Sequence, residues 1–387
     1  MSDDTSGHRG LLAWFSMGHL ANDWAPSAIW IIAPAIAVTM DLSPAEVGLL
    51  ITIAHFGAAL GYLPAGVLAD RVADRGRLLL ITFWWVAFGY LAASFAPGYW
   101  TLTLMLAVAG LGDTAWHPIA TGVLAQSLPQ RRAHALGIHG MTGIFAEVLA
   151  PVSVGFLLAW FDWRVALQIS TIPAILMGVA FFRVAGSVPR SPHHAISLAD
   201  LRSLWSVWRV PRGLSVIGMI SVYNMSLLAI LSMAPLFLQQ VHGLSLAQTG
   251  VVFSAMVLSG ALVQPAIGRL SDTAGRKPVF IAGTVAAGIT CMAIAWSTTL
   301  VAAVLAMIAA VAALYGIRSS VLASAIEFGG RREATTLGLT FMLLDGVGAL
   351  GAGLAGVAGN FDMHYAFVLA ACMAGIAAVA AVPIMWK

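Results

Sequence analysis

The sequence predicts an all-α membrane protein with twelve transmembrane helices arranged as two pseudo-symmetric bundles of six. Of its 387 residues, 60% are hydrophobic and only 9% are charged, whereas soluble domains carry about 25% charged residues. Apolar segments of about 20 residues, the length that crosses a bilayer, occupy nearly the whole chain. Short motifs also recur about 200 residues apart, as expected for a duplicated bundle.

Twelve apolar segments are expected to form the helices. Their many Gly and Ala residues suit close helix packing in lipid. The expected spans are 11–38, 45–69, 78–96, 100–125, 135–160 and 165–184, then 214–240, 246–268, 278–297, 299–326, 335–358 and 363–386. This divides the chain into an N-terminal bundle (1–185), a cytoplasmic linker (186–213) and a C-terminal bundle (214–387). Within the linker, residues 197–209 fit either an amphipathic helix at the membrane surface or a loosely structured connection.

Basic residues lie almost entirely on one side of these spans. All of the 19 Lys and Arg residues except Arg164 and Arg318 fall on the side of the two termini. The positive-inside rule assigns that side to the cytoplasm. We therefore expect a multi-pass protein of the cell inner membrane with both termini in the cytoplasm. The same distribution explains the net charge of +3 without a nucleic-acid partner.

A ten-residue loop motif identifies a family resemblance. The stretch from Gly268 to Lys277 reads GRLSDTAGRK and resembles the signature loop of the major facilitator superfamily, G-x-L-x-D-x-x-G-R-K. A first copy runs from Gly66 to Arg77, at the matching point of the repeat, with about three extra residues. The resemblance implies a transporter with two six-helix halves, in which this loop controls gating.

Physical chemistry suggests how such a loop could control a gate. Glycines permit tight turns, a carboxylate can cap a helix N-terminus, and basic residues can pair with it or with lipid phosphates. The expected gating residues are Gly66, Asp70, Arg71, Asp74, Arg77, Gly268, Asp272, Gly275, Arg276 and Lys277. Because the first copy is longer, either Asp70 or Asp74 could make the family's contact.

Three further stretches resemble the fosmidomycin-resistance branch of drug:proton antiporters. They are residues 19–23, 110–118 and 143–155. The third resembles the antiporter motif g-x-x-x-G-P-x-x-G-G, although Ala150 replaces the Gly before Pro and an acid, Glu147, is present. This narrower resemblance implies export of a drug-like solute in exchange for protons.

Acids and histidines within the spans are the candidate proton-coupling groups, because charge at the bilayer centre is costly and commonly functional. We assign this role to Asp23, Asp113 and Glu147. His19–Asp23 and Asp113–His117 are i,i+4 pairs, so each pair shares one helix face. The four side chains of these two pairs could alternatively bind a divalent transition metal, or form structural hydrogen bonds.

The candidate substrate-binding residues are His19, Trp24, Trp116, His117, Arg318 and Asp345. Family resemblance would place several of them around a central space. Arg318 would either pair with an acid such as Asp345 or Glu327, or bind an anionic ligand through its planar fork. The tryptophans would form an aromatic wall, or else serve as interfacial anchors.

These observations predict a secondary active transporter that works by alternating access. Its expected activity is proton-coupled export of a small anionic or amphiphilic solute. The alternative is a transition-metal or organic-anion carrier that uses the His/Asp groups of the N-terminal half. No motif of an intramembrane protease, a nucleophilic enzyme or a phosphate-binding loop is present in the sequence, so we expect no enzyme activity and no cofactor. The expected partners are the solute, protons and membrane lipid, and the expected state is a monomer.

Overall fold

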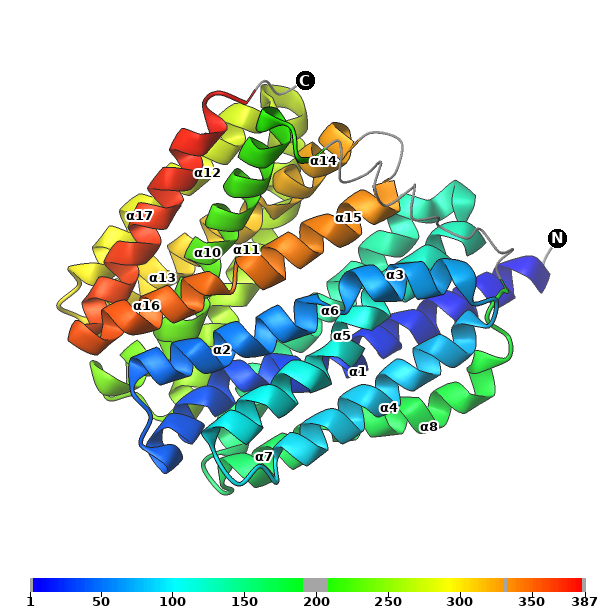
Figure 1. Cartoon of the computed structure of the whole chain (residues 1–387), viewed down its shortest axis with the longest axis horizontal. Coiled ribbons are helices and arrows are strands. Elements are labelled where there is room, and N and C mark those ends of the chain that lie inside the picture. The colour runs from blue at the N-terminus through cyan, green and yellow to red at the C-terminus, as the bar shows by residue number, and fades with distance from the viewer. Residues whose placement is uncertain (1–2, 191–207, 330–332, 385–387) are drawn as a thin grey trace.

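The structure is a computed structural model that describes residues 3–190, 208–329 and 333–384 (Figure 1). Every regular element in these ranges is helical. Residues 191–207, which include most of the predicted linker helix (197–209), lie outside the described residues.

The N-terminal half contains eight α-helices and one short 3-10 turn. They are α1 (Asp3–Met40), α2 (Pro44–Ala59), α3 (Tyr62–Arg71), α4 (Arg75–Ala93), α5 (Tyr99–Ser127), η1 (Pro129–Arg131), α6 (Arg132–Leu157), α7 (Trp163–Ser170) and α8 (Ile172–Ala185). Two predicted spans are each split, the second into α2 and α3 and the sixth into α7 and α8. The half ends where the predicted linker begins.

The C-terminal half repeats this plan after the linker. Its elements are α10 (Pro211–Gln240), α11 (Leu246–Ala274), α12 (Arg276–Ala295), α13 (Leu300–Gly316), α14 (Arg318–Gly329), α15 (Glu333–Met342), the π-helical stretch η2 (Leu343–Val347), α16 (Leu350–Phe361) and α17 (Met363–Ala381). Here the tenth span is split into α13 and α14, and the eleventh is interrupted by η2.

Eleven helical segments of the described chain are long and apolar enough to cross a membrane. The fold is therefore that of a multi-pass membrane protein, as predicted. The helix outside this set is α5, which is 29 residues long and packs among the other helices of its half. Its middle contains Asp113 and His117, which make it more polar than the others. The expected count of twelve spans stays a prediction, since α5 is not among the eleven segments.

Helix caps repeat between the halves at the end where α2 and α11 begin. Ser43 starts α2 and Ser245 starts α11, each with a capping box to the residue three positions later. Asp162 caps α7 and Asp362 caps α17. We call this the acidic end. The opposite end, which holds the two motif loops with Arg77 and Arg276, is called the basic end.

The two halves pack tightly at the acidic end. There α2 meets α16, and a Cβ added to Gly48 would lie 2.4 Å from the carbonyl oxygen of Ala352. Likewise α6 meets α11, and a Cβ added to Gly250 would lie 2.6 Å from the carbonyl oxygen of Pro151. These two contacts are related by the internal repeat, since Gly250 is the counterpart of Gly48. Figure 1 shows the two sets of helices diverging towards the basic end, where both termini lie.

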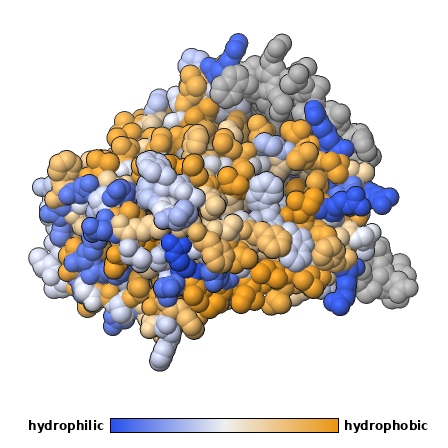
Figure 2. Space-filling model, turned by 60° about the horizontal axis from the view of Figure 1, so that its bottom comes forward, coloured by the Kyte–Doolittle hydropathy of each residue, from blue (hydrophilic) through white to orange (hydrophobic). Residues whose placement is uncertain are grey.

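The outer surface matches a protein surrounded by lipid. Figure 2 shows a face on which hydrophobic residues form a broad band, with hydrophilic residues mainly towards its two sides. Large apolar side chains are well exposed, among them Phe88, Leu104, Phe182, Ile289 and Leu305. Such exposure is unfavourable in water but stable in a bilayer.

Candidate functional site

Breaks in three spans place polar residues at the contact between the halves. Tyr62 is the first residue of α3, after the break at Leu60 and Gly61. Arg318 is the first residue of α14, and Asp345 lies in η2. Irregular backbone at membrane depth is tolerated where it is buried in protein or lines a polar space, and π-helical turns are frequent at functional sites. The breaks therefore mark the interface between the halves as a candidate site.

Within the N-terminal half, His19 and Asp23 form the pair predicted from their spacing. His19 Nε2 lies 3.1 Å from Asp23 Oδ2, and the side chains are only 10% and 13% exposed. On its other side, His19 Nδ1 lies 2.7 Å from the backbone oxygen of His139 on α6. A carbonyl oxygen can only accept, so Nδ1 carries the proton of that bond. Nε2 and the carboxylate therefore need a further proton, or a cation, between them.

Asn22 links this pair to the second predicted acid. Its side chain is fully buried. The Asn22 Nδ2 group donates to Asp113 Oδ1 at 2.8 Å and to the Asp113 backbone oxygen at 3.2 Å. The same amide lies 3.3 Å from Asp23 Oδ1. Asn22 was missed by the sequence reasoning, although it lies beside Asp23 and has a repeat counterpart in Asn224.

His117 completes a group with the geometry of a possible metal site. Its Nε2 lies 3.9 Å from Asp23 Oδ1, and ligand atoms of His19, Asp23 and His117 all lie within 4.8 Å of one another. Two imidazoles and one carboxylate suit Fe(II), Mn(II) or Zn(II). Asp113 was also expected in this set, but in the described structure its carboxylate accepts from Asn22 and it is outside the group.

Two tyrosines connect the halves by hydrogen bonds to acids. Tyr62 of the N-terminal half donates to Asp345 Oδ2 at 2.5 Å. Tyr315 of the C-terminal half donates to Glu147 Oε2 at 3.0 Å. The two acids lie on the fifth span of their respective halves, so the arrangement is reciprocal. Neither tyrosine was predicted, because a tyrosine in an apolar segment carries no distinctive sequence signal.

Of the alternatives left open for Arg318, the described structure does not show the pairing with Asp345. In the described part of the chain, its guanidinium has no hydrogen-bond or ion-pair partner, and Asp345 instead accepts from Tyr62. Its Cζ lies 5.8 Å from the ring centroid of Tyr315, and its charge interacts at longer range with Asp345 and Glu147. The side chain of Glu327 lies outside the described residues.

The two predicted tryptophans do not form one wall. Trp116 is fully buried in a core cluster of the N-terminal half, with its ring 4.7 Å from that of Phe83 and 5.9 Å from that of Phe15. It therefore lies behind the site as a packing residue. Trp24 is half-buried against the main core.

The second motif copy forms local contacts at the basic end. Gly275 has φ +95°, a conformation that favours glycine, and it separates α11 from α12. Arg276 Nη1 lies 3.3 Å from Asp272 Oδ1, and Lys277 donates to the backbone oxygen of Val382. Gly268 lies within α11, where an added Cβ would be 3.1 Å from Ser319 Oγ.

The extra residues of the first copy form the turn between α3 and α4. Asp74 caps α4 by accepting from the Arg77 N–H at 2.9 Å, and Arg71 lies in the last turn of α3. The side chain of Asp70 lies outside the described residues. Arg75, which was not predicted, is buried and donates to the Ala69 backbone oxygen and to Gln126 Oε1. Of the two acids left open, the structure thus shows Asp74 as a helix cap.

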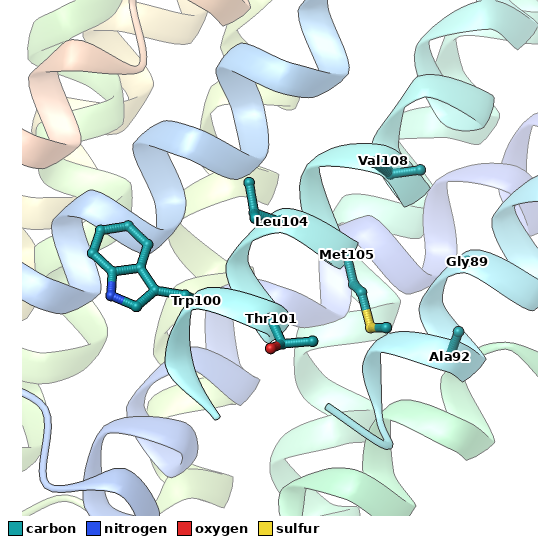
Figure 3. A pocket seen from close by; sticks show the side chains of 7 residues that line it. All are labelled: Gly89, Ala92, Trp100, Thr101, Leu104, Met105 and Val108. Atoms are coloured by element: carbon teal, nitrogen blue, oxygen red, sulfur yellow. The ribbon is translucent and has the colours of Figure 1, made fainter. Parts of the chain in front are cut away.

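A groove elsewhere on the surface differs in character from this site. It lies between α4 and α5, as Figure 3 shows. Its lining consists of Gly89, Ala92, Trp100, Thr101, Leu104, Met105 and Val108. The lining has no ionisable group and belongs to the apolar outer surface, so the groove fits contact with lipid acyl chains.

Comparison with known proteins agrees with the family resemblance of the motif and with the helical fold. A family model described as Major Facilitator Superfamily matches residues 15–343 and 216–387. The chain belongs to the Major Facilitator Superfamily. Its relatives named below are transporters, and transporters of this superfamily carry small-molecule solutes, usually as monomers.

Sequence relatives include carriers with different named solutes. The chain is 34% identical to a probable 4-methylmuconolactone transporter of Cupriavidus pinatubonensis over 38% of its length and 35% of the relative's. It is 25% identical to an MFS-type efflux pump of Mycolicibacterium smegmatis, with coverage of 70% and 65%. It is 30% identical to the niacin transporter NiaP of Acinetobacter baylyi, with coverage of 46% and 37%. The matches thus span 35% to 65% of the length of these relatives.

Solved structures share the fold. A bacterial homologue of the human lysosomal transporter Spinster, in an inward-facing and occupied conformation, matches with a TM-score of 0.81 at 17% identity, covering 97% of both chains. The nucleoside transporter NupG matches with a TM-score of 0.75 at 14% identity, covering 97% of this chain and 98% of NupG. At these identities the similarity shows the fold alone. The narrower resemblance to the fosmidomycin-resistance branch stays a prediction.

Proposed function

We propose that this protein is a secondary active transporter that couples the movement of a small anionic or amphiphilic solute to protons by alternating access. The observation that carries the proposal is the His19–Asp23 pair. Because His19 Nδ1 donates its hydrogen to the His139 carbonyl oxygen, a further proton of the pair would be shared between Nε2 and the carboxylate. A proton in such a position can be gained on one side of the membrane and lost on the other.

The surroundings of Asp23 support a coupled network. The groups that interact with it include His19 and Asn22 on α1, Asp113 and His117 on α5, and His139 and Glu147 on α6. Acids and histidines that interact this closely titrate as a unit. Asp113 and Glu147 are therefore included in the proposed proton-coupling set, with Asp23 as its centre.

Arg318 supports an anionic solute. In the described structure the acids that interact with Arg318, Asp345 and Glu147, are hydrogen-bonded to tyrosines. A charge at membrane depth without a direct partner is costly, and a bound anion would neutralise it. Two of the named relatives support this solute class, because niacin is a carboxylic acid and muconolactones also carry a carboxyl group. The efflux pump among the relatives supports the export direction that the antiporter motif implies.

The orientation follows from the basic residues. We place the basic end, with both termini, in the cytoplasm and the protein in the cell inner membrane, following the positive-inside rule. In this orientation the tightly packed acidic end closes the site from the outside. The conformation is then inward-facing.

A second candidate function is transport of a divalent transition metal. It is favoured by the 4.8 Å grouping of His19, Asp23 and His117. A metal carrier should bind Mn²⁺ or Zn²⁺ in the purified state and lose this binding in His117→Ala, whereas a proton-coupled anion carrier should not bind either metal.

Proton flux in reconstituted vesicles tests the main proposal. Vesicles that contain wild-type protein or the Asp23→Asn variant would be loaded with a pH-sensitive dye. Each preparation would then be given carboxylates, phosphonates, amphiphilic drugs, Mn²⁺ or Zn²⁺ in separate experiments. We expect an anionic or amphiphilic solute to drive proton movement in the wild type, and this movement to be absent in Asp23→Asn. Solute uptake without proton movement in the wild type would contradict the coupling.

A further inference from the structure

We propose that the solute is a small planar carboxylate, bound through Arg318 with its flat face against His117 or Phe341, the two end rings of a row whose middle ring is Tyr62. This inference rests on the proposed transport function and specifies its solute class. In this proposal Arg318 selects a solute with a negative charge, which is the charge requirement. The aromatic rings select a planar solute, which is the shape requirement.

The charge requirement follows from the reciprocal tyrosine bonds. Asp345 and Glu147 are the acids that interact with Arg318, and either could in principle pair with it. Each acid instead accepts a hydrogen bond from a tyrosine of the opposite half. This leaves the donors of Arg318 available in the described structure. A carboxylate ligand can accept two parallel bonds from a guanidinium, a geometry that a lysine ammonium does not offer.

The shape requirement follows from a stack of rings that crosses the interface. The rings of His117 and Tyr62 have centroids 6.0 Å apart and are inclined by 29°. Those of Tyr62 and Phe341 have centroids 5.7 Å apart and are inclined by 23°. Tyr62, in the middle, is only 6% exposed, whereas the rings at both ends are partly exposed. A planar ligand can therefore stack against an end of the row, because aromatic rings attract one another in offset-stacked arrangements.

The cation and the rings belong to one site. Arg318 begins α14, which packs against α15, the helix of Phe341, and α15 packs against α3, which begins at Tyr62. The charge of Arg318 also acts at longer range on Tyr62 and His117. His117 and Tyr62 come from the N-terminal half, while Arg318 and Phe341 come from the C-terminal half. A ligand that meets both requirements would thus contact both halves, which is the position from which solute binding can affect their rocking.

Binding to the purified full-length protein in detergent tests this inference without a proton gradient. The probes are benzoate, its neutral isostere benzamide, and the non-planar anion cyclohexanecarboxylate, each measured by isothermal titration calorimetry. We expect benzoate to bind at least about tenfold more tightly than either analogue, a difference of about 1.4 kcal/mol. Equal binding of benzamide would overturn the charge assignment, and equal binding of cyclohexanecarboxylate would overturn the planar-shape assignment.

Variants identify the residue responsible. Arg318→Gln should lose benzoate binding, and Arg318→Lys should retain it weakly, because the charge remains without the fork. Arg183→Gln, an exposed position on α8, is the matched control and should bind benzoate like the wild type. Thermal unfolding would confirm that each variant is folded. Unchanged binding in Arg318→Gln would overturn the inference.

The two proposals can fail separately. If no probe binds while another solute drives proton movement in vesicles, the planar-carboxylate inference is wrong and the transport proposal stands. If benzoate binds as expected but no solute moves protons, the coupling is wrong and the binding site stands.

Discussion

At the scale of single residues, Asn22 connects two carboxylates, Asp23 and Asp113, of the proposed proton-coupling set. It is fully buried and offers its amide hydrogens to Asp113 and Asp23. Its repeat counterpart Asn224 is also buried but donates to the backbone oxygen of Leu344 at 2.6 Å. The two asparagines thus occupy equivalent positions with different partners. A comparison of variants at the two positions can therefore separate an effect on coupling from an effect on packing.

Asn22→Leu is expected to reduce proton-driven transport by about tenfold or more, since loss of a donor to a buried acceptor costs about 1–3 kcal/mol. Solute-driven proton movement in vesicles measures this effect. Asn224→Leu should lower thermal stability and leave the proton-to-solute ratio unchanged. Equal loss of coupling in both variants would show that Asn22 acts only in packing.

At the scale of elements, helix starts at the acidic end are set by short polar residues. Asp362 accepts from the His364 N–H at 2.9 Å and contacts its ring nitrogen at 2.7 Å. These hydrogen bonds, chiefly that from the backbone N–H, lower the pKa of Asp362 below its usual value of 3.8. A lowered folded-state pKa adds stability above the unfolded value, and this stability is lost as the pH falls through the folded-state pKa.

Asp362→Ala should therefore lower the unfolding temperature at neutral pH, because replacing an N-cap acid by Ala costs about 1 kcal/mol. The difference from wild type should shrink as the pH falls below about 3.8. Thermal unfolding in detergent at several pH values measures it. A difference that stays constant across this range would mean that the carboxylate charge does not contribute.

The sequence predicted the helical elements well because their apolar length and repeated motifs are local properties. The capped starts at Ser43 and Ser245 agree with the predicted spans within about two residues. The break before Tyr62, the break before Arg318 and the π-helical stretch at Asp345 were not predicted. They depend on packing between the halves, and the order of residues in the sequence does not show which segments pack together.

The site was predicted only in part, because some of its contacts lie within one helix and others lie between the two halves. The i,i+4 rule correctly paired His19 with Asp23, because both lie on one helix. The bonds from Tyr62 to Asp345 and from Tyr315 to Glu147 join residues far apart in the sequence. Their existence could be recognised only after the two bundles were placed together.

At the scale of the whole molecule, close backbone contacts hold the acidic ends of the halves together. Gly48 on α2 faces α16 and Gly250 on α11 faces α6, and both approaches are too close for a side chain. At Gly137 and Gly338, a repeat-related pair on α6 and α15, an added Cβ would meet no atom within 4 Å. The absence of a side chain at Gly48 and Gly250 therefore stabilises the conformation with the acidic ends in contact. The absence of a side chain at Gly137 and Gly338 does not.

The double variant Gly48→Ala with Gly250→Ala should shift the population towards a conformation with separated acidic ends. Spin labels would be attached at Val38→Cys and Phe361→Cys, two highly exposed positions. Pulsed electron–electron double resonance would then detect a longer distance between the two labels. The exposed Cys372 would first be replaced by Ser. Gly137→Ala with Gly338→Ala is the control and should leave the distances unchanged. Identical distributions in the two double variants would contradict this view of closure.

The measurement that tests the central claim most directly separates coupling from transport at Asp23. Vesicles with wild type, Asp23→Asn or the exposed control Asp41→Asn would be given a radiolabelled solute that drives proton movement in the wild type. Solute exchange without a gradient and solute accumulation driven by a pH gradient are then compared. We expect Asp23→Asn to keep exchange and to lose accumulation, and Asp41→Asn to keep both. Accumulation at the wild-type level in Asp23→Asn would contradict the claim that Asp23 is the centre of proton coupling.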